Sequence, residues 1–252
     1  MPGRFSLIGK GRAGGSIHAA LVDLGWECTA VFGRHDDVSE AATSVDVCII
    51  ATPDRSIASV AGAIRQGDAE GTSGVVLHLS GALGLDVLAP HRRGALHPLV
   101  SLANADVGAA QLRVAWFAVA GDPIATSLAQ QLSGNHFVIA DEDRARYHAT
   151  AAIASNHLVA LLGQVERLAA SLDIPFDVFL PLVQASIDNV AALGPSAALT
   201  GPAARGDLET IAKHRAALAT GQTRELVAYD ALVDLAMRLA KQAPDNEETT
   251  ER

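Results

Sequence analysis

The stretch that decides the fold is RFSLIGKGRAGG, at residues 4–15. It begins with a short apolar run from Phe5 to Ile8 and passes directly into three glycines spaced as GxGxxG, namely Gly9, Gly11 and Gly14. In this pattern the first glycine permits a tight turn, the second lets the backbone approach a phosphate, and the third lets a helix pack closely. The stretch therefore predicts a strand, a glycine turn and a helix whose N-terminus holds a dinucleotide pyrophosphate. A glycine turn without a ligand is the alternative.

Short β-branched runs alternate with helical stretches from residue 4 to about residue 140. A run such as Val47 to Ala51 is apolar on both faces, which is typical of a parallel sheet that helices cover on both sides. The alternation predicts an α/β fold, a doubly wound and mostly parallel sheet, over residues 1–140. The expected strands are residues 4–8, 27–32, 45–51, 75–79, 95–97, 115–120 and 136–139. The expected helices are residues 14–24, 54–65 and 122–132.

After Asp141 the strand signals stop and Ala-rich helical stretches follow, so we expect a smaller all-α domain over residues 141–243. Asp141 and Asp207 are expected to cap two of its helices. Residues 244–252 are charged and lack an apolar anchor, which predicts a frayed tail. The expected helices are residues 141–172, 177–193, 207–219 and 224–241.

Composition excludes several classes of protein. Of the 252 residues 49% are hydrophobic and 19% charged, as in an ordinary globular protein. The net charge is −9 and no run of Lys or Arg occurs, so no nucleic-acid partner is expected. The first apolar run is too short for a signal-peptide core, and no stretch of about 18 uninterrupted apolar residues occurs. We therefore expect a cytoplasmic protein without a membrane partner.

The two cysteines, Cys28 and Cys48, lie in strand-like runs without ligand spacing. This indicates buried free thiols, with no disulfide and no metal site.

The end of the second strand indicates which cofactor the turn would hold. Proteins that bind NAD place an acidic residue about 20 positions after the last motif glycine, where this chain has Gly33 and Arg34. A guanidinium there can form a bidentate pair with a 2′-phosphate, which favours NADP(H). Asp36 and Asp37 are close enough to keep NAD open. The expected cofactor contacts are Gly9, Lys10, Gly11, Arg12, Ala13, Gly14, Gly33, Arg34, Ala51, Thr52, Pro53 and Ser80.

Two histidines, His78 and His97, lie at the ends of neighbouring strands of the expected sheet. Ligands bind outside the carboxyl ends of such strands, so both imidazoles and Ser80 are expected at one crevice. Packed, hydrogen-bonded histidines are the alternative.

The helical domain offers a second polar group. His148, Ala152 and Asn156 are spaced i, i+4 and i+8, which predicts one shared helix face, with Ser155 beside it. The alternative is a buried polar pair that satisfies itself. Thr200 and Arg205 lie in a loop punctuated by Gly and Pro, which either presents them to an anionic substrate or forms a turn before the cap at Asp207.

Together these residues resemble a family, the Rossmann-like proteins with a DUF2520 C-terminal domain, in the 6-phosphogluconate-dehydrogenase-like group that includes pyrroline-5-carboxylate and ketopantoate reductases. The matching pieces span roughly residues 4 to 240. The three nearest the C-terminus are more specific to this family than the glycine turn is. The pieces are Gly9 to Gly14, Ala51-Thr52-Pro53-Asp54, His78-Leu79-Ser80-Gly81-Ala82, His97-Pro98-Leu99, Tyr147-His148 with Ser155-Asn156, and Thr200-Gly201-Pro202 through Arg205-Gly206-Asp207.

The resemblance implies an NADP-type fold, a helical domain that often dimerises, and a substrate pocket between the domains. Some members look like an alternative class of ketopantoate reductase. Related dehydrogenases carry a lysine four residues before the asparagine of the interdomain helix, where this chain has Ala152. A different proton donor is therefore needed, and an imidazole suits that role because its unperturbed pKa is about 6.5.

We therefore predict an NADPH-dependent oxidoreductase that reduces the C=O of a small anionic 2-oxo acid, with 2-dehydropantoate as the first choice. Reduction of a cyclic imine such as pyrroline-5-carboxylate and a non-catalytic NADP-binding regulator are the alternatives. The catalytic candidates are His148 as first proton donor, His97 as second, and Asn156 and Ser80 as orienting partners. The substrate-binding candidates are His97, His148, Ser155, Asn156, Thr200 and Arg205, with Arg205 contacting a carboxylate.

Helices at residues 151–162 and 231–239 look apolar over more than one face, which predicts a homodimer through the helical domain.

Overall fold

The computed structural model of the chain describes residues 2–66, 73–102 and 105–242. Contacts between Cα atoms divide the chain after Asn156 into two units, which are described separately. The division falls later than residue 140, where the strand pattern ends, because the helix at residues 144–152 makes side-chain contacts with the sheet unit. The expected tail at residues 244–252 lies outside the described residues.

The first unit contains a seven-stranded sheet in the order β2-β1-β3-β4-β5-β6-β7. Every neighbouring pair is parallel except β5 with β6, which is antiparallel. The predicted doubly wound, mostly parallel sheet is confirmed. The strands are β1 (Arg4–Ile8), β2 (Glu27–Phe32), β3 (Val47–Ile50), β4 (Val75–His78), β5 (Arg93–Leu99), β6 (Trp116–Gly121) and β7 (His136–Val138).

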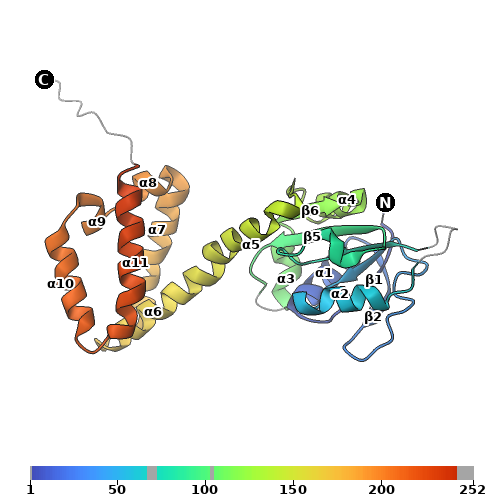
Figure 1. Cartoon of the computed structure of the whole chain (residues 1–252), viewed down its shortest axis with the longest axis horizontal. Helices are drawn as coiled ribbons and strands as arrows, with labels where there is room; N and C mark the ends of the chain where they lie inside the picture. The colour runs from blue at the N-terminus through green and yellow to red at the C-terminus, as the bar shows by residue number, and fades with distance from the viewer. Residues whose placement is uncertain (1, 67–72, 103–104, 243–252) are drawn as a thin grey trace, which may run out of the picture. The chain divides into compact units, whose positions relative to one another are not determined.

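Helices cover both faces of the sheet because each central strand is apolar on both sides. In β3, Val47 and Ile49 belong to one core cluster, whereas Cys48 and Ile50 belong to the other. The first cluster contains Ile17 of α1, which packs beside α3 in Figure 1. The helices of this unit are α1 (Arg12–Asp23), α2 (Asp54–Ala63), η1 (Leu85–Leu88), α3 (Ala105–Leu112), α4 (Pro123–Leu132), η2 (Asp141–Asp143) and α5 (Arg144–Ala152).

The strand order creates one switch point that matters for function. β1 lies between β2 and β3 in the sheet. The connection from β1 to β2 therefore runs in one direction across the sheet, and the connection from β2 to β3 runs back in the other direction. A crevice opens at the carboxyl ends of the strands at such a point. Gly9 follows β1 there, and Ala51 follows β3, with the Ala51 amide donating to the carbonyl of Ile8 at 2.8 Å.

Two cap predictions have different outcomes. The Asp207 carboxylate accepts a hydrogen bond from the amide of Thr210 at 3.0 Å, as expected of a helix cap. Asp141 as a cap is wrong. Its carboxylate accepts hydrogen bonds from the Leu85 amide at 2.8 Å and from the Nε of Arg144 at 3.2 Å, so contacts with the start of η1 and with a buried guanidinium replace the cap.

The second unit is helical, as predicted, and its strongest polar contact joins α6 to the start of α11. Arg167 donates to both carboxylate oxygens of Glu225, at 2.7 and 3.0 Å, and Gln164 donates to the Glu225 carbonyl at 2.8 Å. Helix α11 also contacts α8, α9 and α10 (Figure 1). The elements are η3, a π-helical turn (Ile153–His157, which begins in the first unit), α6 (Leu158–Ala170), η4 (Phe176–Phe179), α7 (Leu180–Leu193), α8 (Pro195–Ala198), α9 (Pro202–Arg205), α10 (Leu208–Ala219) and α11 (Thr223–Ala240).

One span of the described residues, Phe176–Leu193, is long and apolar enough by length and composition to cross a membrane. Its mean hydropathy is 1.3 and none of it is buried. The span contains two charged residues, Asp177 and Asp188, so it is not an uninterrupted apolar run. A core helix of a soluble protein meets the same criterion, so this one span is weak evidence for a transmembrane helix.

Candidate functional site

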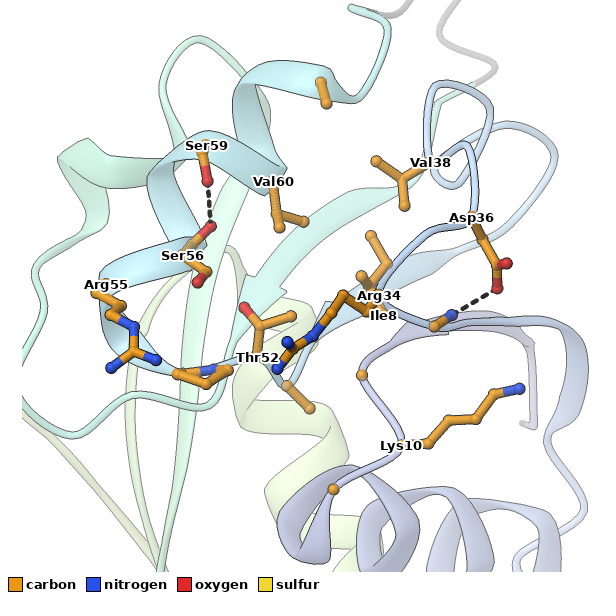
Figure 2. A pocket seen from close by; sticks show the side chains of 16 residues that line it. Ile8, Lys10, Arg34, Asp36, Val38, Thr52, Arg55, Ser56, Ser59 and Val60 are labelled. Atoms are coloured by element: carbon orange, nitrogen blue, oxygen red, sulfur yellow. Dashed lines mark hydrogen bonds between the residues drawn. The ribbon is translucent and has the colours of Figure 1, made fainter.

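A cavity of about 710 Å³ lies in the first unit beside the glycine turn, within the usual range of roughly 300–1,000 Å³ for small-molecule sites. Its walls come from the ends of β1, β2 and β3 and from α2, as Figure 2 shows. Eight of its residues are among the expected cofactor contacts: Gly9, Lys10, Gly11, Gly33, Arg34, Ala51, Thr52 and Pro53. Four other expected contacts do not line it: Arg12, Ala13, Gly14 and Ser80.

The three motif glycines have different physical reasons to lack a side chain. Gly9 has a φ of +107°, and a Cβ there would lie 2.7 Å from the Ala51 carbonyl oxygen. A Cβ on Gly14 would lie 2.1 Å from the Gly9 carbonyl oxygen, so Gly14 brings α1 against the turn. A Cβ on Gly11 would meet nothing within 4 Å. The first and third glycines therefore close the turn, and the second leaves its backbone open to a ligand.

Two arginines lie on opposite sides of Thr52 at this cavity. Arg34 follows β2 and Arg55 lies in the first turn of α2, and Figure 2 shows the Arg34 guanidinium beside Thr52 with Arg55 on the other side of it. Both residues are exposed, and neither forms an ion pair with another described residue. The Oγ1 of Thr52 is buried and has no hydrogen-bond partner among the described residues. These groups are suited to an anionic ligand with hydrogen-bond acceptors.

The two aspartates that leave NAD as an alternative cofactor, Asp36 and Asp37, differ in position. Asp36 lines the cavity, and its carboxylate accepts a hydrogen bond from the Gly33 amide at 2.6 Å. Asp37 does not line it and instead bonds the Ser39 amide at 2.9 Å. The Asp36 carboxylate thus already closes the loop that presents Arg34.

Sequence reasoning missed the α2 wall of this cavity. Arg55, Ser56 and Ser59 contribute its polar groups. The available signal was the position of Arg55 and Ser56 directly after the Thr52-Pro53 strand end, in the first turn of a helix.

A second polar cluster lies in the same unit at the ends of β4 and β5. The Ser80 hydroxyl donates to Asp54 at 2.7 Å and accepts from the amides of Ala82 and Leu83 at 3.2 and 3.1 Å. Its hydrogen is therefore already used, and Ser80 shapes the turn at Gly81. Contact of Ser80 with a cofactor or substrate stays a prediction.

His97 meets both His148 and Tyr147 of α5. The ring centroids of His97 and His148 are 6.1 Å apart, so these two candidate site residues lie in one cluster. The Tyr147 hydroxyl lies 2.6 Å from Nδ1 of His97. Burial, with the neighbouring charges of His148 and Arg144 assisting, lowers the pKa of His97 to about 4, so its imidazole is neutral at neutral pH. Burial raises the pKa of Tyr147 to about 12, so the hydroxyl keeps its proton.

Beneath these rings lie two buried polar residues that face no solvent. His78 is fully buried, its Nε2 lies 3.3 Å from the Gly84 carbonyl, and burial lowers its pKa to about 4. Arg144, also fully buried, donates to Asp141 and to the Ser80 carbonyl at 3.2 and 3.4 Å, and its Nη2 has no partner among the described residues. His78 is thus a packed histidine, the alternative given for it above.

The shared face of His148, Ala152 and Asn156 assumed an unbroken α-helix. The π-helical turn Ile153–His157 interrupts it, so the four-residue spacing holds only as far as Ala152. Both His148 and Asn156 are exposed, and Ser155 is half-buried. Their contact with one ligand stays a prediction.

Thr200 and Arg205 belong to the second unit and are exposed. Thr200 lines a mostly apolar hollow of about 290 Å³ between α9, α10 and α11. The same hollow contains His214 and Tyr229, whose Nδ1 and hydroxyl oxygen are 2.9 Å apart.

Comparisons with known proteins match these two units. Residues 117–236 match the model of a family described as a domain of unknown function, DUF2520. No curated protein matches the chain. A candidate NADP oxidoreductase from Bacteroides fragilis is 21% identical, with a TM-score of 0.78 over 94% of this chain and 98% of that one.

Two further solved structures have the same coverage, 94% of this chain and 98% of theirs. A protein from Thermotoga maritima is 25% identical with a TM-score of 0.72. A pyrroline carboxylate reductase from Plasmodium falciparum, with NADP bound, is 10% identical with a TM-score of 0.59. The likeness to DUF2520 proteins and to pyrroline-5-carboxylate reductases is confirmed at the level of the fold, whereas the likeness to ketopantoate reductases stays a prediction. Residues 117–236 thus resemble DUF2520, and the fold of the chain resembles those of solved structures that include a candidate NADP oxidoreductase.

Proposed function

We propose that this protein binds NADP(H) and works as an oxidoreductase. The observation that carries the proposal is the cavity at the switch point, which combines an open glycine turn with two unpaired arginines. The reductase of the same fold that has NADP bound supports this choice of cofactor. When bound, the nicotinamide supplies or accepts a hydride.

The residues of the cavity fit such a cofactor. The open backbone at Gly11 and the N-terminus of α1 would hold the pyrophosphate. Arg34 and Arg55 would hold the 2′-phosphate through charge-assisted hydrogen bonds. The unpartnered Oγ1 of Thr52 would gain the partner that it lacks.

Replacing Arg34 with aspartate should erode or reverse the preference for NADPH. Wild type should bind NADPH at least about tenfold more tightly than NADH, a difference of about 1.4 kcal/mol, because only the phosphorylated cofactor engages the guanidinium. Fluorescence titration of both cofactors measures the ratio. Arg113→Asp is the control for added negative charge, because Arg113 pairs with Asp23 at 3.1 Å and does not line the cavity. Equal affinities in wild type would contradict this assignment.

We further propose that the substrate is a small 2-oxo acid and that the reaction reduces its carbonyl, with 2-dehydropantoate as the specific substrate. The cluster of His97, Tyr147 and His148 offers N–H and O–H hydrogen-bond donors for a carbonyl oxygen. One arginine, Arg205, with neutral partners suits a monocarboxylate better than a phosphorylated sugar. The pyrroline carboxylate reductase of the same fold favours a cyclic imine as the second candidate.

NADPH oxidation with millimolar 2-dehydropantoate should exceed background in wild type, and Arg205→Ala should raise KM. The reason is loss of the carboxylate contact while the reacting groups stay intact. Arg215→Ala is the matched control, since Arg215 already pairs with Asp230 at 3.1 Å. No activity in wild type would exclude 2-dehydropantoate, and activity with pyrroline-5-carboxylate instead would favour the imine. Binding without oxidation of either substrate would favour a regulator.

We also propose a homodimer through the helical unit. Helix α7 has no buried residue, and its apolar side chains at Leu182, Ile187 and Leu193 are exposed. Exposed apolar surface of this kind is typical of an interface. Light scattering at micromolar concentration should give twice the chain mass of 26.0 kDa, and Ile187→Glu should shift it toward one chain. A wild-type mass of one chain would contradict the dimer.

A further inference from the structure

The closest polar contact in the β4–β5 cluster joins two residues that are 50 positions apart in the chain. The Tyr147 hydroxyl of α5 lies 2.6 Å from Nδ1 of His97 in β5, and their rings meet edge to face at 84°. Tyr147 was not among the residues that the sequence pattern singled out for chemistry. The contact gives it a defined partner inside the site.

The direction of this hydrogen bond follows from the two protonation states. Tyr147 keeps its proton, and its hydroxyl has one recorded partner among the described residues, Nδ1 of His97. A neutral imidazole carries one hydrogen, on Nδ1 or on Nε2. If the tyrosine donates to Nδ1, the hydrogen of His97 must lie on Nε2. The opposite direction would leave the phenolic hydrogen without a partner in a half-buried position.

The Nε2 edge of His97 lies over the backbone of Gly81. A Cβ on Gly81 would come within 2.9 Å of Nε2 and Cε1 of His97 and within 2.8 Å of Cδ2 of His148. The missing side chain lets both imidazoles meet above the turn that follows β4. No hydrogen-bond partner of His97 Nε2 is recorded in the described part of the chain, so its hydrogen is available to a ligand.

We propose that Tyr147 holds His97 as the Nε2–H tautomer, and that the two side chains together protonate the carbonyl oxygen of the substrate. This deepens and rests on the reductase function proposed above. His97 touches the reacting oxygen, and Tyr147 acts through His97 as a positioning and proton-supplying residue.

The proton steps balance. As hydride reaches the carbonyl carbon, the C=O π pair moves to oxygen, and the oxygen takes the hydrogen from Nε2 of His97. Nδ1 of the same ring takes the phenolic hydrogen, so the imidazole stays neutral and exchanges one tautomer for the other. After the product leaves, Nε2 takes a proton from solvent and Nδ1 returns its proton to the tyrosinate, which restores the starting tautomer. The transfer runs downhill because an alkoxide is a stronger base than a phenolate.

His97 rather than His148 is assigned to the oxygen because of what surrounds each ring. His148 is exposed, whereas His97 is half-buried and held by Tyr147. The charged and titratable groups that act on His97 are His148 and Arg144 from α5, Asp54 from α2 and His78 from β4. The sequence pattern favours His148 as the first proton donor and His97 as the second, and this proposal reverses that ranking.

The first test measures the tautomer in the full-length protein without cofactor or substrate. Two-bond ¹H–¹⁵N correlation spectra should show His97 as the Nε2–H form in wild type and as a mixture of tautomers in Tyr147→Phe. Tyr229→Phe is the matched control, because Tyr229 makes the same kind of contact with Nδ1 of His214 in the second unit. It should change the His214 signals and leave those of His97 in place. An Nδ1–H tautomer in wild type would overturn the proposal.

The second test measures turnover and NADPH affinity in Tyr147→Phe, His97→Gln and the double variant. Tyr147→Phe should lower kcat by about 10²-fold with an unchanged Kd for NADPH. His97→Gln keeps an N–H donor but cannot pass a proton on, so it should lose at least as much. The double variant should lose no more than His97→Gln alone, because the two residues act as one unit.

Multiplied losses in the double variant, or unchanged kcat in Tyr147→Phe, would overturn the relay. Failure of wild type to bind NADPH would instead overturn the proposed function and leave the tautomer measurement standing.

Discussion

Gly14→Ala is expected to weaken NADPH binding by at least about 100-fold, or about 2.8 kcal/mol. A Cβ at this position would lie 2.1 Å from the carbonyl oxygen of Gly9 and 3.1 Å from Cβ of Ala51. The first of these contacts is with backbone, which cannot rotate away as a side chain can. Helix α1 must therefore shift from the turn after β1, and the phosphate site formed by both is lost. Overpacking of this kind should also lower the free energy of unfolding by about 1–3 kcal/mol.

Gly62→Ala provides the matched control for that variant. Gly62 lies near the end of α2, and a Cβ there would meet nothing within 4 Å. The substitution should leave NADPH affinity unchanged and should stabilise the helix by up to about 1 kcal/mol. Titration calorimetry and urea denaturation measure both quantities. If Gly14→Ala bound NADPH as wild type does, the phosphate would not rest on the turn and α1.

The free energy of unfolding should fall as pH is lowered from about 6.5 toward 4. Burial lowers the pKa of His78 from 6.5 to about 4 in the folded protein. Between these values the unfolded chain binds a proton that folded His78 does not, so acid favours unfolding. Above pH 6.5 both states are neutral and the full stability is present. His78 is fully buried, and its share of the loss reaches about 3 kcal/mol by pH 4.

Urea denaturation of wild type and of His78→Gln across this pH range measures the effect. The glutamine keeps an N–H that can donate to the Gly84 carbonyl but does not titrate. The pH dependence should therefore be shallower in His78→Gln. His35→Gln, which removes an exposed histidine after β2, should keep the wild-type slope. The same slope in all three proteins would show that His78 does not bring about the acid sensitivity.

The glycine turn and the sheet could be predicted because their signals are local. Residues 4–15 carry the whole strand–turn–helix pattern, and β3 shows its burial on both faces within four residues. Only one of the two arginines in the cavity wall could be predicted from the sequence. Arg34 follows the motif at a known spacing, whereas Arg55 reaches the same cavity only because β3 lies beside β1.

The cluster of His97, Tyr147 and His148 shows more clearly what could not be predicted from the sequence. His97 and His148 could be proposed as site residues from strand ends and helix spacing, but Tyr147 depends on a contact across 50 positions. The same holds for Asp141, whose carboxylate bonds an amide 56 residues away instead of capping its own helix. Residues 153–157 carry no sequence signal that marks a π-helical turn, so the face of Asn156 was assigned from regular α-helical spacing.

The most direct test of the account is a calorimetric titration of the wild-type chain with NADPH, NADH and 2′,5′-ADP. The last of these carries the adenosine with its 2′- and 5′-phosphates but no nicotinamide, so it reports on the adenosine half of the site, which includes Arg34 and Arg55. We expect one NADPH site per chain, binding of NADPH at least about tenfold tighter than that of NADH, and competition between 2′,5′-ADP and NADPH. Absence of NADPH binding, or equal affinity for both cofactors with no competition by 2′,5′-ADP, would contradict this expectation.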